Sequence, residues 1–209
     1  WPSAVPAWMG VFAAAWWVFW AVSAINVVNF MDGIDGLIGS QALIFGVYLA
    51  LHGQPGGTAQ AVGLALAGAS FGFLFWNWPP ARIFLGDVGS GALGLLFVLG
   101  GLLLMREGRA SIVTAFLPLY PIFLDASTTL LRRLRHGEPV AEAHRSHLYQ
   151  RLANGTWGHA RVTLLYAAAS LAALPVVRLP LASRTLGVAV YFLAILGLGS
   201  ALDRRASGR

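Results

Sequence analysis

The sequence predicts an all-α protein: a polytopic bundle of about seven transmembrane helices with a polar site at one end. Its 209 residues are 57% hydrophobic and only 11% charged, and their mean hydropathy of +0.70 is far above the range of soluble domains. The apolar runs are too long for barrel strands and lack the alternation that a barrel interior requires. The chain has no cysteine, which excludes disulfides, thiolate metal sites and cysteine nucleophiles.

Seven apolar runs have about the 20 residues needed to cross a bilayer. We expect spans at residues 5–25, 34–52, 58–76, 89–105, 111–131, 161–178 and 181–202. Residues 1–209 then form one integral-membrane domain. Its loops at 26–36, 77–90 and 132–160 each bring carboxylate, amide or imidazole groups, so we expect them to meet on one membrane face.

The basic residues predict which face this is. All 14 are arginine. If the Asn26 loop faces the cytoplasm, ten arginines lie on that side and four on the other, in agreement with the positive-inside rule. The net charge of +6 sits beside apolar spans, which favours anionic lipid headgroups or an anionic substrate over nucleic acid as partners.

The stretch N-V-V-N-F-M-D-G-I-D-G-L at residues 26–37 places two amides and two carboxylates at the end of a span. Ionisable groups beside hydrocarbon are costly, so they indicate a functional site. Residues three apart are neighbours on a helix, but Asn26, Asn29, Asp32 and Asp35 would spiral about halfway round a straight one. We therefore expect the helix to end near Asp32, with a glycine turn that brings Asp35 back toward the same point.

The stretch F-L-G-D-V-G-S-G-A-L-G at residues 84–94 places Asp87 between glycines at the start of a span. The N–H groups of residues 89–91 would form a helix N-terminus able to bind an anion. Beside Asp32 and Asp35, Asp87 would complete an all-oxygen site for Mg²⁺ or Mn²⁺ that bridges to substrate phosphates. By itself, Asp87 is better explained as a helix N-cap.

Two side chains of the same loop, Asn77 and Phe84, are weak signals individually, because a lone phenylalanine in a loop usually packs. As a pair beside a metal carboxylate they would suit a nucleobase, which needs a stacking surface and a hydrogen-bonding edge.

The stretch P-V-A-E-A-H-R-S-H-L-Y-Q-R-L at residues 139–152 predicts a helix beginning at Pro139. His144, His147 and Arg151 would then form one stripe able to hold a diphosphate. A basic amphipathic helix resting on anionic headgroups explains this segment equally well.

Other ionisable groups are expected to have structural or solvated roles. Asp125 would extend toward the interface or pair with Arg132 or Arg133. The remaining groups of this kind are Glu138, Glu142, His52, His136 and His159.

Four motifs follow one another along the chain: N-x-x-N-F-M-D-G-I-D-G-L, N-W-P-P-A-R-I-F-L-G-D-V-G-S-G-x-L-G, P-I-F-L-D and H-R-S-H-L-Y-Q-R-L. In this order and at this spacing they resemble the polyprenyl-phosphate N-acetylhexosamine-1-phosphate transferases of glycosyltransferase family 4. The resemblance covers essentially the whole chain. It implies Mg²⁺-dependent transfer of a sugar 1-phosphate from a UDP-N-acetylhexosamine to undecaprenyl phosphate, with release of UMP, at the cytoplasmic face of the bacterial inner membrane. It leaves open whether the protein forms a homodimer.

The resemblance also implies roles for the motif residues. Asp87 and Asp32 match the metal site, and His147 matches the first histidine of a cytoplasmic histidine motif, so these three are the expected catalytic residues. With the basic stripe added, the expected substrate-binding residues are Asn29, Asp35, Asn77, Phe84, His144 and Arg151.

Two departures from the family pattern qualify this assignment. Tyr149 and Gln150 stand where many relatives have further histidines, a form similar to the branch that starts O-antigen or capsular chains. The family also has a paired Asp-Asp and several helices ahead of the Asn26 motif, so we expect this chain to be a C-terminal portion that is inactive alone.

Two other functions remain open: an ion- or proton-coupled transporter, and an inactive fragment with a structural role. A transporter would need polar residues distributed through its spans, whereas here they gather at one face.

Overall fold

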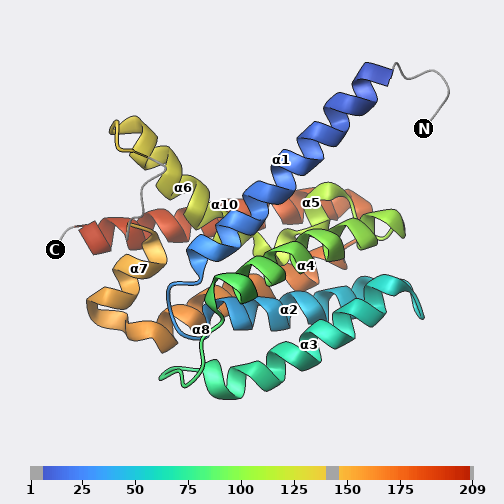
Figure 1. The fold of residues 1–209 in the computed structure, drawn as a ribbon. Helices are drawn as coiled ribbons and strands as arrows, with labels where there is room; N and C mark the ends of the chain where they lie inside the picture. The colour runs from blue at the N-terminus through green and yellow to red at the C-terminus, as the bar shows by residue number, and fades with distance from the viewer. Residues whose placement is uncertain (1–6, 140–145, 208–209) are drawn as a thin grey trace.

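The computed structural model describes residues 7–139 and 146–207. These residues form helices joined by short turns, and no strand occurs among them (Figure 1). The longer helices are α1 (Ala7–Met31), α2 (Leu37–His52), α3 (Thr58–Asn77), α4 (Gly86–Arg106), α6 (Tyr120–Arg135), α8 (Gly158–Leu171) and α10 (Leu181–Ser207). The short ones are α5 (Ile112–Ala115), α7 (Leu148–Leu152) and α9 (Ala173–Val177), with a 3₁₀ turn at Leu117–Leu119 and a π-helical turn at Ala153–Trp157. The all-α fold class is confirmed.

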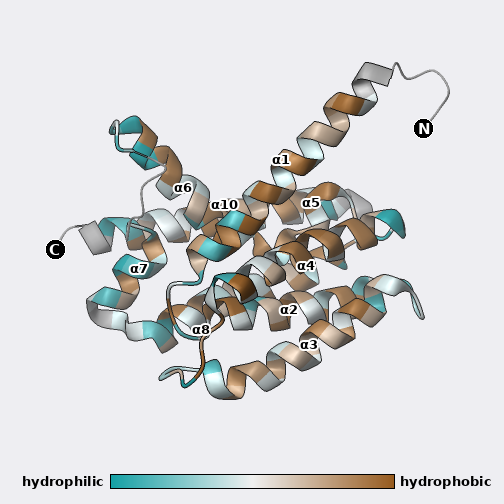
Figure 2. Cartoon of the chain, in the orientation of Figure 1, coloured by the Kyte–Doolittle hydropathy of each residue, from teal (hydrophilic) through white to brown (hydrophobic). Residues whose placement is uncertain are grey.

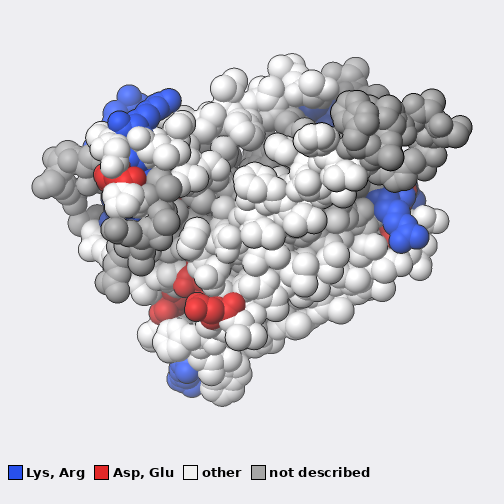
Figure 3. Space-filling model, turned by 45° about the horizontal axis from the view of Figure 1, so that its top comes forward, with Lys and Arg blue, Asp and Glu red and all other residues white. Residues whose placement is uncertain are grey.

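Five helical stretches in the described residues are long and apolar enough to cross a membrane. They are Gly10–Met31, Thr58–Asn77, Gly86–Arg106, Gly158–Val177 and Ser183–Arg204. Figure 2 shows mostly apolar residues along α3 and α4 and polar ones around α7 and the end of α6. On the face drawn in Figure 3, an uncharged surface covers the middle of the molecule and the charged side chains lie toward its ends. This distribution is that of a polytopic membrane protein.

Two of the seven expected spans take another form. Residues 111–131 are not one helix: α5 and the 3₁₀ turn precede α6, and Pro118 lies in that turn. Proline lacks an N–H donor and interrupts a helix, and α6 carries a buried Asp125 and three arginines in its last turn. The span expected at 34–52 is the 16-residue α2, shorter than the other apolar helices.

Helix α2 lies at the centre of the bundle, since eleven of its sixteen residues are buried. Phe45 and Tyr48 are fully buried, and Phe45 packs edge-on against Phe97 of α4. Helix α3 approaches α2 closely because both present glycine. A Cβ added at Gly46 would lie 2.9 Å from the Gly63 carbonyl oxygen, a distance that only small residues permit.

The connecting segments separate into two ends of this bundle. At one end, Glu107 after α4 accepts hydrogen bonds from the backbone N–H groups of Gln54 and Ala59, at 2.8 and 2.9 Å. At the other end, the turn after α1, the loop between α3 and α4 and the start of α8 come together, as the contacts below show. The candidate site lies at this second end.

Candidate active site at one end of the bundle

The end of α1 and the start of α4 are joined by a polar contact. The Ser90 hydroxyl in the first turns of α4 donates to Asn29 Oδ1 on α1 at 2.5 Å. α1 ends at Met31, one residue before Asp32, as the motif predicted. α4 begins at Gly86, earlier than expected, so its unpaired N–H groups belong to residues 85–88 rather than 89–91.

Asp32 and Asp87 lie close enough for their charges to interact. Burial and the negative charge of Asp87 raise the pKa of Asp32 to about 7. Asp87 is exposed in the first turn of α4, where the partial positive charge of the helix N-terminus stabilises a carboxylate. The two carboxylates expected in one metal site, more than fifty residues apart in sequence, therefore share one end of the molecule.

Asp35 does not join this pair. Its carboxylate accepts a hydrogen bond from the Ala81 N–H at 3.1 Å and lies 3.3 Å from His159 Nδ1. Among the described residues, no group of three or more acidic or histidine side chains is close enough to hold one metal ion. The turn that follows Asp32 directs Asp35 toward the α3–α4 loop and α8, so the expected convergence of three carboxylates is wrong.

Asn77 holds this turn against the α3–α4 loop. Its Oδ1 accepts from the Gly36 N–H at 3.0 Å, and its Nδ2 donates to the Ile83 carbonyl at 2.9 Å. Gly36 has a φ of 77°, a backbone conformation that favours glycine. Asn77 is buried, whereas Phe84 is 74% exposed. Phe84 therefore presents a free aromatic face, and the amide of Asn77 serves mainly to shape the loop.

The third motif is folded differently from the expected stripe. α7 begins only at Leu148, and His147 precedes it in an extended conformation. His147 is buried, with Nδ1 3.8 Å from Asp125 Oδ1. His144 lies outside the described residues, and Arg151 pairs with Asp203 of α10. In the described part of this segment, His147 and Arg151 face different acidic partners and form no common basic stripe.

Asp125 explains this arrangement. Its carboxylate accepts from the N–H groups of Leu148 and Tyr149, at 2.9 and 3.0 Å, and from the Tyr166 hydroxyl at 2.6 Å. The first N–H groups of a helix have no partner within it, and the carboxylate supplies one from α6. Asp125 is structural, as expected, but the expected pairing with Arg132 or Arg133 is replaced by this cap.

Tyr149 connects the capped segment to the Asp32 turn. Its hydroxyl donates to the Phe30 carbonyl at 2.9 Å. A Cβ added at Gly33 would lie 2.2 Å from that hydroxyl oxygen and 3.2 Å from Gln150 Nε2, so glycine is required there. Tyr149 and Gln150 therefore lie directly against the turn that carries Asp32.

Three residues near the site were not singled out by their sequence pattern as functional. Ser90 contacts Asn29, His159 contacts Asp35, and Asp125 orders the α7 segment. Ser90 had a detectable signal, because it follows Asp87 at helical spacing in a glycine-rich helix start. His159 had none, since only the fold brings α8 beside residue 35.

The donor set at the Asp32–Asp87 pair fits a hard divalent cation. Carboxylate oxygens and an amide oxygen such as Asn29 Oδ1 are the ligands that Mg²⁺ and Mn²⁺ prefer. Burial and, to a smaller extent, the neighbouring Asp87 carboxylate raise the pKa of Asp32, and a cation held between the two carboxylates would offset their repulsion. Asp32, Asp87 and Asn29 are therefore the residues that would hold such an ion.

The fold and site together define a polytopic membrane protein with an acidic, oxygen-rich site where α1 and α4 meet. A family model described as "Glycosyl transferase family 4" matches residues 3–105. These residues include α1 to α4 and hence both carboxylates. The match supports the family that the four motifs indicate.

Curated relatives point the same way. The chain is 29% identical to a "Probable undecaprenyl-phosphate N-acetylglucosaminyl 1-phosphate transferase" of Bacillus subtilis, over 71% of this chain and 43% of that protein. It is 37% identical to a "Phospho-N-acetylmuramoyl-pentapeptide-transferase" of Frankia alni and to that of Frankia casuarinae, in each case over 37% of this chain and 31% of the relative. The chain thus spans less than half the length of these relatives.

Proposed function

We propose that this chain carries part of the active site of a polyprenyl-phosphate sugar-1-phosphate transferase. The donor would be a UDP-N-acetylhexosamine and the acceptor undecaprenyl phosphate. The products would be a polyprenyl diphospho-sugar and UMP. The names of the relatives support the reaction class, and the resemblance of the third motif favours O-antigen or another cell-envelope polysaccharide as the pathway.

The observation that carries the proposal is the meeting of α1 and α4. Asn29 and Asp32 come from one helix end, Ser90 and Asp87 from the other, and the Ser90–Asn29 hydrogen bond of 2.5 Å joins them. Such a site suits a diphosphate, which carries several negative charges and binds most often through a divalent cation. Phe84, largely exposed on the loop that leads into α4 and Asp87, would stack on the uracil ring.

The chemistry asks mainly for alignment and charge neutralisation. A phosphate oxygen of the acceptor attacks the phosphorus that bears the sugar. The bond from that phosphorus to the bridging oxygen breaks, and UMP leaves with this oxygen. When bound, Mg²⁺ would neutralise charge on the diphosphate. Asp32 and Asp87 hold the binding position, Asn29 supplies an amide oxygen, and the acceptor phosphate is already ionised, so the chain need not remove a proton.

The orientation is part of the proposal. The arginine distribution supports a cytoplasmic position for this end of the bundle, the side on which nucleotide sugars would be available. The arginines of the α6 end, which include Arg132 and Arg133, then lie near the anionic headgroups of the inner leaflet.

The test uses the complete protein in membranes or detergent, supplied with UDP-N-acetylglucosamine, undecaprenyl phosphate and Mg²⁺. Asp87→Asn should abolish UMP release while expression and membrane insertion remain normal. Glu138→Gln is the matched control, because Glu138 is an exposed acid whose contact is with Arg133. Near-normal turnover of Asp87→Asn would remove Asp87 from the site, and ion-coupled flux without UMP release would favour a transporter instead.

A further inference from the structure

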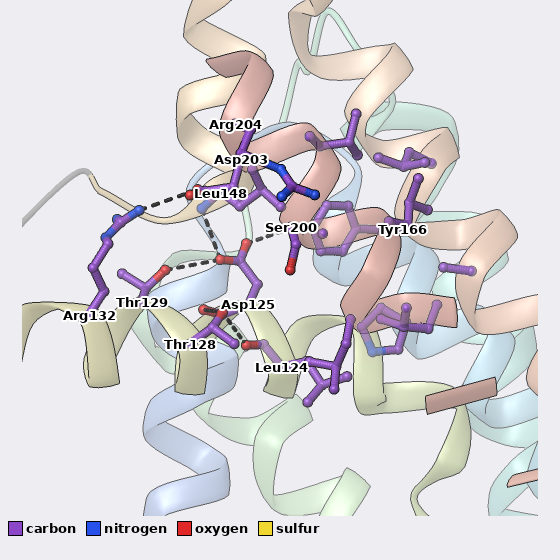
Figure 4. A pocket seen from close by; sticks show the side chains of 18 residues that line it. Leu124, Asp125, Thr128, Thr129, Arg132, Leu148, Tyr166, Ser200, Asp203 and Arg204 are labelled. Carbon is purple, nitrogen blue, oxygen red and sulfur yellow. Dashed lines mark hydrogen bonds and ion pairs between the residues drawn. The ribbon is translucent and has the colours of Figure 1, made fainter. Parts of the chain in front are cut away.

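A cavity lies between α6, α8 and α10, and neither Asp32 nor Asp87 lines it (Figure 4). Its volume is about 370 Å³, within the range of small-molecule sites. The lining residues come from these three helices and from Leu148 at the start of α7. We call this cavity the α6–α10 groove.

The inner walls of the groove are apolar. Leu165 and Ala169 of α8 face Ile195, Leu196 and Leu198 of α10. α8 and α10 both belong to stretches that are long and apolar enough to span a membrane. The walls therefore lie at the depth of lipid chains, and an apolar chain would be their natural occupant.

The mouth of the groove is charged. Arg132 Nη1 lies 3.3 Å from Asp203 Oδ1, and Arg151 pairs with the same carboxylate. Arg204 also lines the mouth (Figure 4). Asp203 thus pairs with two guanidinium groups, and Arg132 also donates to the Ser146 carbonyl at 2.6 Å. Arg204 adds a third positive charge on this side of the groove, which leaves an excess of positive charge.

A second carboxylate on the groove wall does not cancel this excess. Asp125 lines the groove, but its oxygens accept hydrogen bonds from two backbone N–H groups and from the Tyr166 and Thr129 hydroxyls. These donors stabilise its charge locally. The mouth thus favours an anionic group above an apolar chain.

The geometry separates the groove from the reacting centre. Tyr149 is fully buried, its hydroxyl contacts the Phe30 carbonyl at the end of α1, and neither residue lines the groove. Leu148, its neighbour, faces the groove. The α7 segment would therefore lie between the Asp32 turn and a phosphate bound at Arg132 and Arg204. The molecule that carries this phosphate need not be a reactant.

We propose that the α6–α10 groove binds an anionic phospholipid of the surrounding bilayer. One acyl chain lies along α8 and α10, and the phosphate lies between Arg132 and Arg204. The bound lipid fills the space behind Asp125 and supports the α6–α10 contact. This inference does not depend on the proposed transferase reaction.

The test is native mass spectrometry of the complete protein in neutral detergent, titrated with phosphatidylglycerol or phosphatidylcholine. The unmodified protein should retain phosphatidylglycerol preferentially. Gly199→Leu should fill the groove, because a Cβ at Gly199 meets only Leu148 Cδ2, at 3.9 Å, and should weaken binding at least about tenfold. Gly197→Leu is the matched control, since a Cβ there meets nothing within 4 Å and residue 197 is not part of the lining.

The charge at the mouth is tested separately, so that the proposal can still be refuted if Gly199→Leu does not fold. An arginine near an anionic headgroup contributes about 1 kcal/mol, so Arg132→Gln with Arg204→Gln should weaken phosphatidylglycerol binding roughly 30-fold. Arg135→Gln, an exposed change on the same helix, should have no effect. Equal binding of the two lipids, or unchanged binding by both the Gly199 and the double-arginine variants, would overturn the proposal. So would displacement of phosphatidylglycerol by undecaprenyl phosphate, which would assign the groove to the lipid substrate.

Discussion

Asp125 is the position where one substitution should disturb the candidate site without touching it. Its carboxylate accepts from the N–H groups of Leu148 and Tyr149 and from the Tyr166 hydroxyl. Burial would raise the pKa of Asp125, but the hydrogen bonds from His147, Tyr166 and the two N–H groups outweigh burial and hold this pKa below its usual range. The charged form is therefore the one that the fold stabilises.

Asp125→Asn keeps the size of the side chain but replaces one acceptor oxygen with a donor and removes the charge. At least one backbone N–H, that of Leu148 or Tyr149, then faces another donor. A hydrogen bond to a charged group contributes about 1.5–3 kcal/mol, and a buried donor without a partner costs about 1–3 kcal/mol. We expect a loss of about 3 kcal/mol in unfolding free energy, which for a chain of this size lowers the unfolding midpoint by roughly 6–12 °C.

The assay is the apparent unfolding midpoint in detergent, followed by tryptophan fluorescence, together with UMP release by the same preparation of the complete protein. The rate should fall as well, because the Tyr149 contact with Phe30 depends on the capped segment. Thr129→Val, which removes one hydrogen bond to Asp125 of 3.2 Å, is the control and should cost only about 0.5–1.5 kcal/mol. A midpoint for Asp125→Asn equal to that of the control would refute the reasoning.

The pH dependence of this effect has a definite sign. The pKa of Asp125 is lower in the folded than in the unfolded state, so the stabilisation is complete above the unfolded value of about 3.9. It is lost only as the pH falls through the folded value. The difference between the unmodified protein and Asp125→Asn should therefore be constant from about pH 5 to 8.

Three further predictions concern other parts of the molecule. Phe84→Ala should raise the KM for the nucleotide sugar with little effect on stability, with Val88→Ala, at a still more exposed position, as the control. An unchanged KM would leave Phe84 outside the binding site. Gly33→Ala should lower UMP release because its Cβ would meet the Tyr149 hydroxyl at 2.2 Å. Adding Tyr149→Phe should restore part of the rate. A double variant no better than Gly33→Ala would exclude this clash. Glu107→Ala should lower the unfolding midpoint without changing the KM, since Glu107 lies at the opposite end, and a raised KM would contradict that separation.

The helices were predictable from the sequence where a long apolar run determines them. The spans at residues 58–76 and 89–105 lie within α3 and α4, apart from helix ends shifted by up to three residues, because long apolar runs leave few alternatives to a membrane helix. The run at 111–131 was equally apolar at its start, yet it breaks at Pro118. The buried Asp125 and its partners make the second half an amphipathic helix rather than a span.

The candidate site divides in the same way. The end of α1 beside Asp32 follows from the glycine turn, a local property. The position of the Asp35 side chain does not follow from a local property, because it depends on His159 and on the Ala81 N–H. These groups lie 124 and 46 residues away in the sequence. His147 likewise has its environment set by Asp125, from another helix.

The sequence by itself determined that this chain is helical, that it lies in a membrane and that it resembles glycosyl transferase family 4. Hydropathy, glycine placement and motif order are properties of the linear chain. Only the tertiary structure decided which polar groups face each other. Buried carboxylates take the nearest available N–H and O–H donors, and the nearest donors are known only after the helices have packed.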